Sequence, residues 1–327
     1  MKKEYRTTNQ LMKHLRNKHN ISIKGAQKQK MVNQGYFHGF KGYRFYKSSS
    51  NVINFTDYEE INQTIIFDSK IKTILYSKIM FIETAIKSVV LQIIMDEIKS
   101  TSMDDMFEKV IQNFNKTDPF ATTRKDKKEA QKRFLSLKSF LNAKIRTCYD
   151  NNNNKVVHFS EKNTDLPLWA LFDILMLGDF GNLFNALTFE VRDKISKRFN
   201  ISKSFDTTRK AFGQYIYALK DLRNAIAHNE VVYDSRFLSF KLKKSSRLVL
   251  NKFFNIEDFS LDNISDFIFL IVFLLKSLKI NKTEQKLFIN EIKESFEKYS
   301  AKIGDKMFLS DFCKDNILKL TLIFKKI

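Results

Sequence analysis

Helix-breaking residues are scarce in this chain, and their scarcity constrains its fold more than any other feature. The 327 residues include only 8 Gly and 2 Pro. In a helix interior, Gly and Pro are less favourable than Ala by about 1 and about 3 kcal/mol, respectively. Helices can therefore run long over most of the chain, whose length also allows a substantial core. We expect an all-α protein.

The spacing of apolar residues predicts where these helices lie. Between residues 62 and 100, apolar residues recur at intervals of three and four, as a helix with one buried face requires. Glu83 interrupts this face, and we expect it to pair with a Lys or Arg because a buried carboxylate is costly alone. Mixed alternation over residues 231–250 allows a small β-hairpin. Further helices are expected at 124–146, 166–177, 180–199, 207–227, 262–279, 283–301 and 309–324.

The charge of the chain favours a polyanionic partner. Lys and Arg number 57 against 36 Asp and Glu, which gives a formal net charge of +21. Such an excess repels itself and is commonly neutralised by nucleic acid, with an anionic membrane and a merely solubilising charge as alternatives. The longest apolar run, residues 267–275, is shorter than the roughly 20 residues that span a bilayer. We therefore expect a core helix there and no membrane partner.

The N-terminus and the cysteines favour a cytoplasmic protein. The basic start leads into polar sequence and lacks the apolar core of a signal peptide. Cys148 and Cys313 lie far apart, with no CxxC pair and no histidine at ligand spacing. We expect reduced thiols, no disulfide, no structural metal and no cofactor.

The first 47 residues form a basic segment that ends in an aromatic stretch. They hold twelve Lys or Arg and a single acidic residue, and glycines alternate with aromatic residues over 35–46. Cations reach phosphates and flat rings stack on unpaired bases, which predicts RNA binding. The aromatic side chains can instead pack on the core, and for His38 stacking and packing are equally open. The residues expected to contact RNA are Lys13, Arg16, Lys18, Lys24, Lys28, Lys30, Tyr36, Lys41, Tyr43, Arg44 and Lys47 here, Arg124, Lys127, Lys128 and Lys132 in the helix 124–146, and Lys241, Lys243 and Lys244.

A short polar motif at the end of the helix 207–227 carries the candidate chemistry. Asn224 and His228 are four residues apart and share a helix face, and Arg223 flanks that face. A histidine can move a proton near neutral pH, and an arginine can stabilise charge that builds on phosphate oxygens. These groups suit metal-independent cleavage of RNA by its own 2′-hydroxyl. In the alternative interpretation, Asn224 and His228 bond backbone carbonyls and Arg223 pairs with Asp221 or Glu230.

The motif and three other elements resemble a known family. Arg-Asn-Ala-Ile-Ala-His, residues 223–228, resembles the Arg-x4-His signature of HEPN domains. The aromatic stretch 35–46, Phe81-Ile82-Glu83 in the long helix, and Pro167-Leu168-Trp169 with a helix end at Leu177-Gly178 are similar to elements of the Abi-like (abortive infection, AbiD/AbiF-type) family. The resemblance covers roughly residues 10–235.

The resemblance implies an all-helical HEPN-like bundle that acts on or binds RNA in antiphage defence, as a toxin. Two such motifs usually meet across a dimer, so a chain with one motif implies a homodimer. Some members are linked to a small structured RNA that restrains the toxin. Where HEPN toxins controlled by tyrosine modification carry Tyr, this chain has Glu230.

Three segments follow from these observations: an RNA-binding segment over 1–60, a HEPN-like core over 61–235 and a C-terminal helical extension over 236–327. The function predicted for the whole is an endoribonuclease toxin with Arg223, Asn224 and His228 as its catalytic residues and with no bound metal. A non-catalytic RNA-binding module and a phage-sensing protein on the same scaffold are the alternatives.

Overall fold

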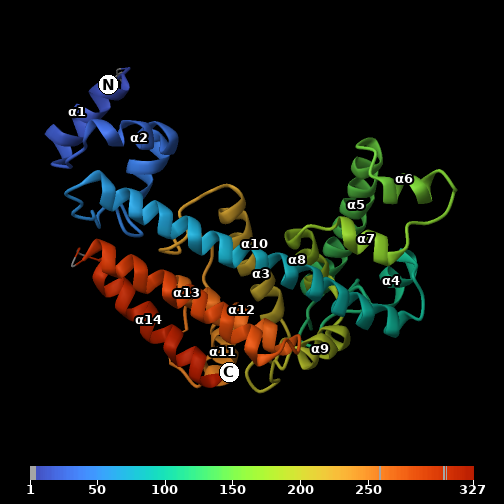
Figure 1. The fold of residues 1–327 in the computed structure, drawn as a ribbon. Coiled ribbons are helices and arrows are strands. Elements are labelled where there is room, and N and C mark those ends of the chain that lie inside the picture. Colours follow the sequence, from blue (N-terminus) through green and yellow to red (C-terminus); the bar gives the residue numbers. More distant parts are fainter. Residues whose placement is uncertain (1–4, 258, 305, 307) are drawn as a thin grey trace.

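The computed structural model describes residues 5–257, 259–304, 306 and 308–327, and it confirms the expected all-α fold (Figure 1). Within these residues there are fourteen α-helices and no strand, only isolated bridges such as Phe45 with Val52. A π-helical segment, Gly35–Lys41, follows α2 directly. The helices are α1 (Thr8–His19), α2 (Lys28–Gln34), α3 (Tyr58–Ile98), α4 (Met103–Lys109), α5 (Arg124–Asp150), α6 (Asn154–Ser160), α7 (Leu168–Ile174), α8 (Leu177–Ala186), α9 (Phe189–Arg198), α10 (Ala211–Ala227), α11 (Lys244–Phe254), α12 (Ile264–Ser277), α13 (Lys282–Ile303) and α14 (Leu309–Lys326).

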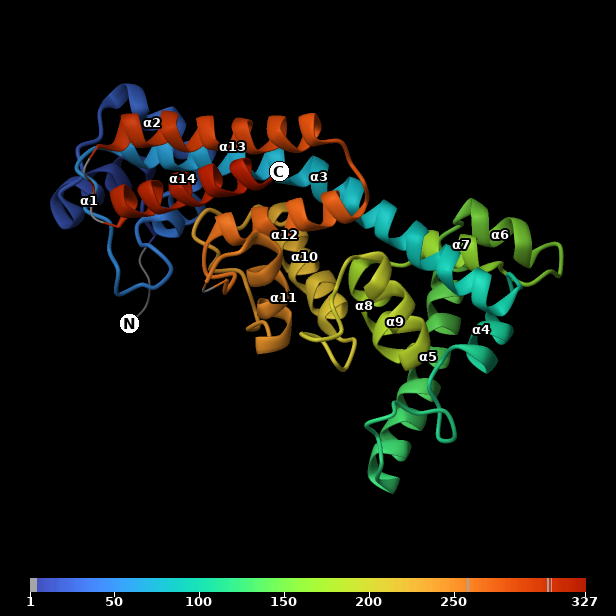
Figure 2. The same ribbon diagram turned by 90° about the horizontal axis from the view of Figure 1, so that it is seen from below.

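Helix α3 is the axis of the molecule. Its 41 residues span about 60 Å at 1.5 Å per residue. It begins at a capping box, in which the side chain of Asp57 accepts from the backbone of Glu59 and the side chain of Glu60 accepts from the backbone of Asp57. Helices α1 and α2 lie near its N-terminal end, α4 to α7 near its C-terminal end, and α10, α12 and α13 pack along it between them (Figures 1 and 2).

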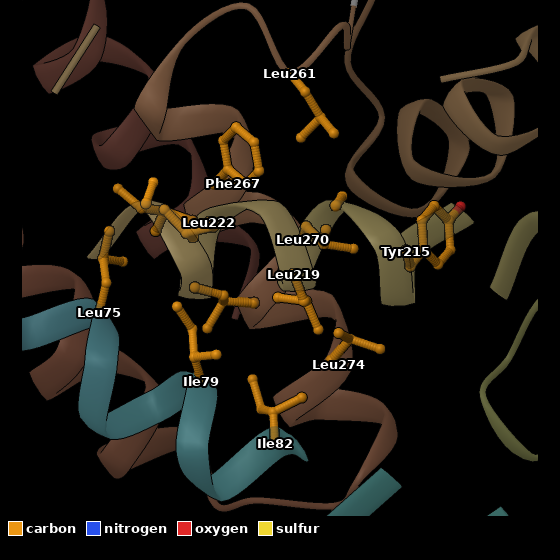
Figure 3. Close-up of a cluster of buried hydrophobic side chains, with 14 of the residues drawn as sticks. Leu75, Ile79, Ile82, Tyr215, Leu219, Leu222, Leu261, Phe267, Leu270 and Leu274 are labelled. Carbon is orange, nitrogen blue, oxygen red and sulfur yellow. The ribbon is translucent and has the colours of Figure 1, made fainter. Parts of the chain in front are cut away.

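The core that positions α10 is built from aliphatic side chains of three helices. Leu75 and Ile79 of α3, Leu219 and Leu222 of α10 and Leu270 of α12 are fully buried against one another (Figure 3). Almost all of α12 is buried, as expected for the apolar run 267–275. No helix among the described residues is long and apolar enough to cross a membrane.

The carboxylate within the apolar face of α3 has the expected partner. The Oε1 atom of Glu83 lies 2.9 Å from Nζ of Lys87, one turn further along the helix, and both side chains are largely buried. The ammonium group also donates to the backbone carbonyl of Leu175. Pairing therefore offsets the burial of this charge, which confirms the expectation.

The β-hairpin expected over 231–250 is absent from this part of the structure, and that prediction is wrong. Residues 231–243 are irregular backbone with two short turns, and α11 begins at Lys244. The backbone N–H groups of Val232 and Tyr233 donate to the carboxylate of Asp68 instead of to a second strand. A turn follows, with Ser235 in the left-handed region (φ 59°). A side chain thus satisfies the donors that a hairpin would have paired.

Two further details differ from the sequence expectations. Residues 166–199 form three short helices instead of two, and Leu177-Gly178 starts α8 instead of ending a helix. The reason is local: the side chain of Asp179 accepts from the backbone N–H of Met176 (3.0 Å) and caps the start of α8.

The segments 1–60, 61–235 and 236–327 all supply buried side chains to one hydrophobic cluster, including Phe40, Leu75 and Phe312.

Candidate functional site

The C-terminal end of α10 is shaped by a left-handed cap. Asn229 has φ 54°, and the N–H groups of Asn229 and Glu230 donate to the carbonyls of Ile226 (3.0 Å) and Ala225 (2.8 Å). Asparagine tolerates this conformation better than most residues, and the paired bonds satisfy carbonyls that the helix end would leave free. The chain therefore turns away immediately after His228, which leaves that imidazole at the surface.

The three motif residues lie at this end of α10, with His228 as its C-cap. The Nη1 atom of Arg223 donates to Oδ1 of Asn224 (3.2 Å), both side chains are half-buried, and His228 is exposed. Neither Asp221 nor Glu230 pairs with Arg223 in the described part of the chain; Asp221 instead bonds Lys220 (2.9 Å). The alternative in which an adjacent acid neutralises the guanidinium is therefore not what the structure shows. Among the described residues, Arg223 thus bonds Asn224 and has no acidic partner.

This geometry suits a phosphodiester ligand. A guanidinium without a carboxylate partner offers N–H donors to phosphate oxygens. The amide of Asn224 holds that guanidinium through its oxygen, so Asn224 is placed to orient Arg223 and not the imidazole. His228 can exchange a proton with a group bound beside Arg223.

A buried carboxylate on α3 joins the motif to the aromatic stretch. Asp68 is fully buried and its Oδ2 atom accepts from the hydroxyl of Tyr43 (2.7 Å) and from Nζ of Lys72 (2.8 Å). Its Oδ1 atom accepts from the backbone N–H groups of Val232 (3.0 Å) and Tyr233 (2.8 Å), just after the motif. Burial and the neighbouring Asp68 raise the pKa of the Tyr43 phenol well above its usual range. One carboxylate thus ties together three segments that are distant in sequence.

A second contact brings a histidine of the N-terminal region beside the motif. Nζ of Lys72 donates to Oδ1 of Asn229 (2.9 Å), and Nδ2 of Asn229 lies 3.1 Å from Nε2 of His38. Asn229 follows His228 directly, and both His38 and His228 are exposed. The end of α10 therefore carries one imidazole from the motif and has another attached to its cap.

Arg236 fixes the aromatic stretch from the other side. Its guanidinium pairs with Asp234, donates to the carbonyls of Gly42 (2.8 Å) and Phe45 (2.7 Å), and lies over the ring of Phe45 (4.4 Å from its centre). Burial alone would lower the pKa of Arg236. The hydrogen bonds and the negative charge of Asp234 outweigh burial, so the pKa is raised overall. The turn after the motif and the stretch 35–46 are therefore one packed unit.

Most of the predicted RNA contacts of the N-terminal segment are at the surface. The cations Lys13, Arg16, Lys18, Lys24, Lys28, Lys30 and Lys41 are exposed, and Tyr36, Arg44 and Lys47 are half-buried. Tyr43 is the exception, because only 1% of it is exposed and its hydroxyl bonds Asp68. The expected contact of Tyr43 with RNA therefore needs correction: this ring is part of the core and presents no face to a base.

The other two basic groups lie elsewhere on the molecule. Arg124, Lys128 and Lys132 are exposed and Lys127 is half-buried on α5, which projects from the end of α3 opposite the N-terminal helices (Figures 1 and 2). Lys241, Lys243 and Lys244 are exposed at the start of α11, which packs against α10. The structure thus joins the aromatic stretch 35–46 to the end of α10 and leaves the α5 group apart.

Sequence reasoning missed the polar residues that organise the site. Asp68 and Lys72 are one turn apart on α3, and this spacing marks an ion pair but not its burial or its partners. The cap at Asn229 could have been predicted from the sequence, because asparagine just after a helix is a common left-handed cap. Nothing in the sequence places His38 beside Asn229, 191 residues away.

Comparison with known protein families shows to which family this chain belongs. Residues 29–234 match the family described as Abi-like protein. The chain belongs to the Abi-like family. The match begins in α2 and ends just after the motif, so it includes the aromatic stretch, Asp68 and Arg223 to His228. Membership of the Abi-like family connects the chain with abortive-infection defence. No curated protein and no solved structure shows significant similarity to it.

Proposed function

We propose that this Abi-like protein is a metal-independent endoribonuclease of the HEPN type, of AbiD/AbiF character, that acts in abortive-infection defence. The observation that carries the proposal is that one helix end carries both an exposed imidazole, at the C-cap His228, and the guanidinium of Arg223, which has no acidic partner among the described residues. Exposed cations of the N-terminal segment support RNA as the ligand, because phosphate contacts dominate nucleic-acid affinity.

The reaction proposed is an internal transesterification. The 2′-oxygen of a ribose attacks the adjacent phosphorus, and His228 removes the 2′-hydroxyl proton as the new bond forms. Arg223, held by Asn224, stabilises the negative charge on the non-bridging oxygens. The bond to the 5′-oxygen then breaks, and that oxygen takes a proton from an acid. The products are a 2′,3′-cyclic phosphate and a 5′-hydroxyl.

A homodimer supplies the second proton-transfer group in this proposal. One imidazole cannot accept and donate a proton in the same step, and the motif occurs once in this chain. On α3, the helix against which α10 packs, Tyr76, Met80 and Phe81 are exposed. Exposed apolar side chains on one helix are suited to contact between two copies. The imidazole of the partner copy then protonates the leaving oxygen.

Replacement of His228 tests the enzyme proposal. For His228→Ala we expect cleavage of single-stranded RNA to fall by about 10²- to 10⁴-fold, the range for loss of a general acid–base group. His158→Ala, which removes another exposed histidine on α6, is the matched control and should cleave normally. Cleavage should persist in EDTA and leave cyclic-phosphate ends. Metal-dependent cleavage, or full activity of His228→Ala, would contradict the proposal.

A non-catalytic RNA-binding module is the second candidate, and the exposed cations of α1 and α2 favour it. They also suit the binding of a small structured RNA that restrains the toxin. The two functions separate experimentally: RNA that co-purifies at a defined full length indicates a bound partner, whereas fragments with cyclic-phosphate ends indicate a cleaved substrate.

A further inference from the structure

The contact between His38 and Asn229 fixes the proton position on an exposed imidazole. The ammonium group of Lys72 can only donate, so the amide of Asn229 must face it with its oxygen (2.9 Å). Its nitrogen, Nδ2, then points at Nε2 of His38 (3.1 Å) and can only donate to it. Nε2 of His38 is therefore the acceptor, and in the neutral ring the proton sits on Nδ1.

The chain of contacts that sets this tautomer is rigid. Lys72 is largely buried and paired with the fully buried Asp68 (2.8 Å), and Asn229 is held by the left-handed cap of α10. A continuous series of polar contacts thus runs from the core to the surface through Asp68, Lys72, Asn229 and His38. A histidine whose ring serves only to pack needs no such support, and His38 is exposed.

The surroundings of His38 are those of a nucleic-acid contact. The preceding residue, Phe37, is 74% exposed, and Nζ of Lys41 lies 5.7 Å from the centre of its ring. The π-helical segment Gly35–Lys41 therefore presents an exposed ring, a cation and an imidazole N–H donor on the unit that carries the end of α10. Exposed rings stack on bases and cations bind phosphates.

We propose that His38 binds the RNA backbone through Nδ1–H, next to the phosphodiester held by Arg223; this inference rests on the proposed ribonuclease function. The π-helical segment then forms the substrate-binding wall of the site, and His38 contacts substrate from the same chain as the motif. Asn229 and Lys72 position it by fixing which nitrogen carries the proton.

Two variants of His38 separate the role of Nδ1 from that of the ring. In His38→Asn the side-chain amide lies near the position of Nδ1 and keeps a donor there, whereas in His38→Gln it lies near Nε2 and the Nδ1 donor is lost. Binding of a fluorescein-labelled single-stranded RNA is measured in a His228→Ala background, so that cleavage does not enter the measurement. We expect His38→Gln to weaken binding about tenfold, as expected for one hydrogen bond to a charged group, and His38→Asn to bind within about threefold of the parent.

Asn229→Gly tests the positioning step. Glycine is favoured at the left-handed cap, so the helix end is retained while the amide is removed. Any loss of RNA affinity caused by Asn229→Gly should be absent when His38 is already Gln, because Asn229 acts on RNA binding only through His38. Thermal melting shows whether each variant is folded.

Each outcome decides the proposal. Unchanged RNA affinity in His38→Gln overturns it, and so does an equal loss in both His38 variants, which would assign the effect to the ring alone. If His228→Ala cleaves RNA at the parent rate, the ribonuclease proposal fails, whereas the relative RNA affinities of the His38 variants still decide whether His38 binds RNA.

Discussion

The N-terminal unit and helix α5 are both strongly basic, yet they are built in opposite ways. In the N-terminal unit (α1, α2 and the stretch 35–46), the exposed cations lie on a segment that is tied to the buried Asp68. This carboxylate accepts four hydrogen bonds: from Tyr43, from Lys72 on its own helix and from the backbone N–H groups of residues 232 and 233. On α5, only Ala130, Leu137 and Leu141 are buried along 27 residues. Some of its charged side chains form surface pairs within the helix, such as Lys132 with Glu129 (2.9 Å), and others pair with α4 and α8.

The difference shows that the net charge of a region does not determine whether its charged side chains are held in a fixed arrangement. Surface pairs like that on α5 contribute little to stability and are screened by salt. A buried, fully bonded carboxylate holds its partners in one arrangement, because breaking any contact leaves a polar group unsatisfied. Both regions can attract RNA, but only the N-terminal unit is joined to the end of α10, through the contacts of Tyr43 with Asp68 and of His38 with Asn229.

The largest expected effect comes from removing the centre of the network. Asp68→Ala leaves the ammonium group of Lys72 buried without its carboxylate and removes the acceptor of Tyr43 and of two backbone N–H groups. We expect the free energy of unfolding to fall by about 3–5 kcal/mol, the usual effect of breaking a buried pair. Urea denaturation measures it.

Glu129→Ala on α5 is the matched control, because it also breaks an ion pair with a lysine, at the surface. We expect a change within about 0.5 kcal/mol. Similar losses in the two variants would show that the network around Asp68 is no more important to stability than a surface pair.

The second test compares the two basic surfaces as RNA contacts. Lys13, Lys18 and Lys28 are exposed on α1 and α2, and Arg124, Lys128 and Lys132 are exposed on α5. Each phosphate contact contributes about 0.7 to the salt slope of single-strand binding. We expect the N-terminal triple substitution to Gln to lower that slope by about 2, and the α5 triple to lower it by less than about 0.7.

Fluorescence anisotropy at several salt concentrations gives both slopes. The opposite ranking would move the RNA-binding surface to α5 and away from the motif. Equal reductions of the two salt slopes would mean that RNA binds both basic surfaces alike, with no preference for the N-terminal unit.

Much of the fold followed from the spacing of apolar residues. The helices over 62–100, 124–146, 262–279, 283–301 and 309–324 lie where expected, to within a few residues. Apolar periodicity is a local signal and needs no knowledge of the partner. It failed over 231–250, where the partner of the backbone is the side chain of Asp68. A contact across more than 160 residues leaves no local trace.

The candidate site divides in the same way. Asn224 and His228 could be predicted to share a helix face from their spacing alone, with Arg223 flanking it. His38, Lys72 and Asn229 could not, because their association depends on how the π-helical segment meets the end of α10. Tyr43 stands among the expected RNA contacts, with packing on the core as the alternative, and its bond to the buried Asp68 shows why it is in the core.

The smallest expected effect isolates one hydrogen bond of the network. Tyr43→Phe removes the hydroxyl that donates to Asp68 (2.7 Å) but keeps the ring, which is stacked on Tyr233 at 6.2 Å. Asp68 retains Lys72 and two backbone donors. We expect the free energy of unfolding to fall by about 1–2 kcal/mol, as for a single hydrogen bond to a charged group. Tyr149→Phe, at an exposed position on α5, should change nothing measurable.

The same pair of variants predicts a difference in alkaline stability. Burial and Asp68 raise the pKa of the Tyr43 phenol, whereas in the unfolded chain a tyrosine ionises near pH 10. The stability that this phenol contributes is complete below about pH 10 and is lost as pH rises above it, because only the unfolded state releases the proton. Tyr43→Phe should therefore lose stability less steeply above pH 10 than the parent, while Tyr149→Phe follows the parent. Parallel curves for Tyr43→Phe and the parent would mean that the phenol also ionises in the folded protein, and that Asp68 does not hold it as the structure indicates.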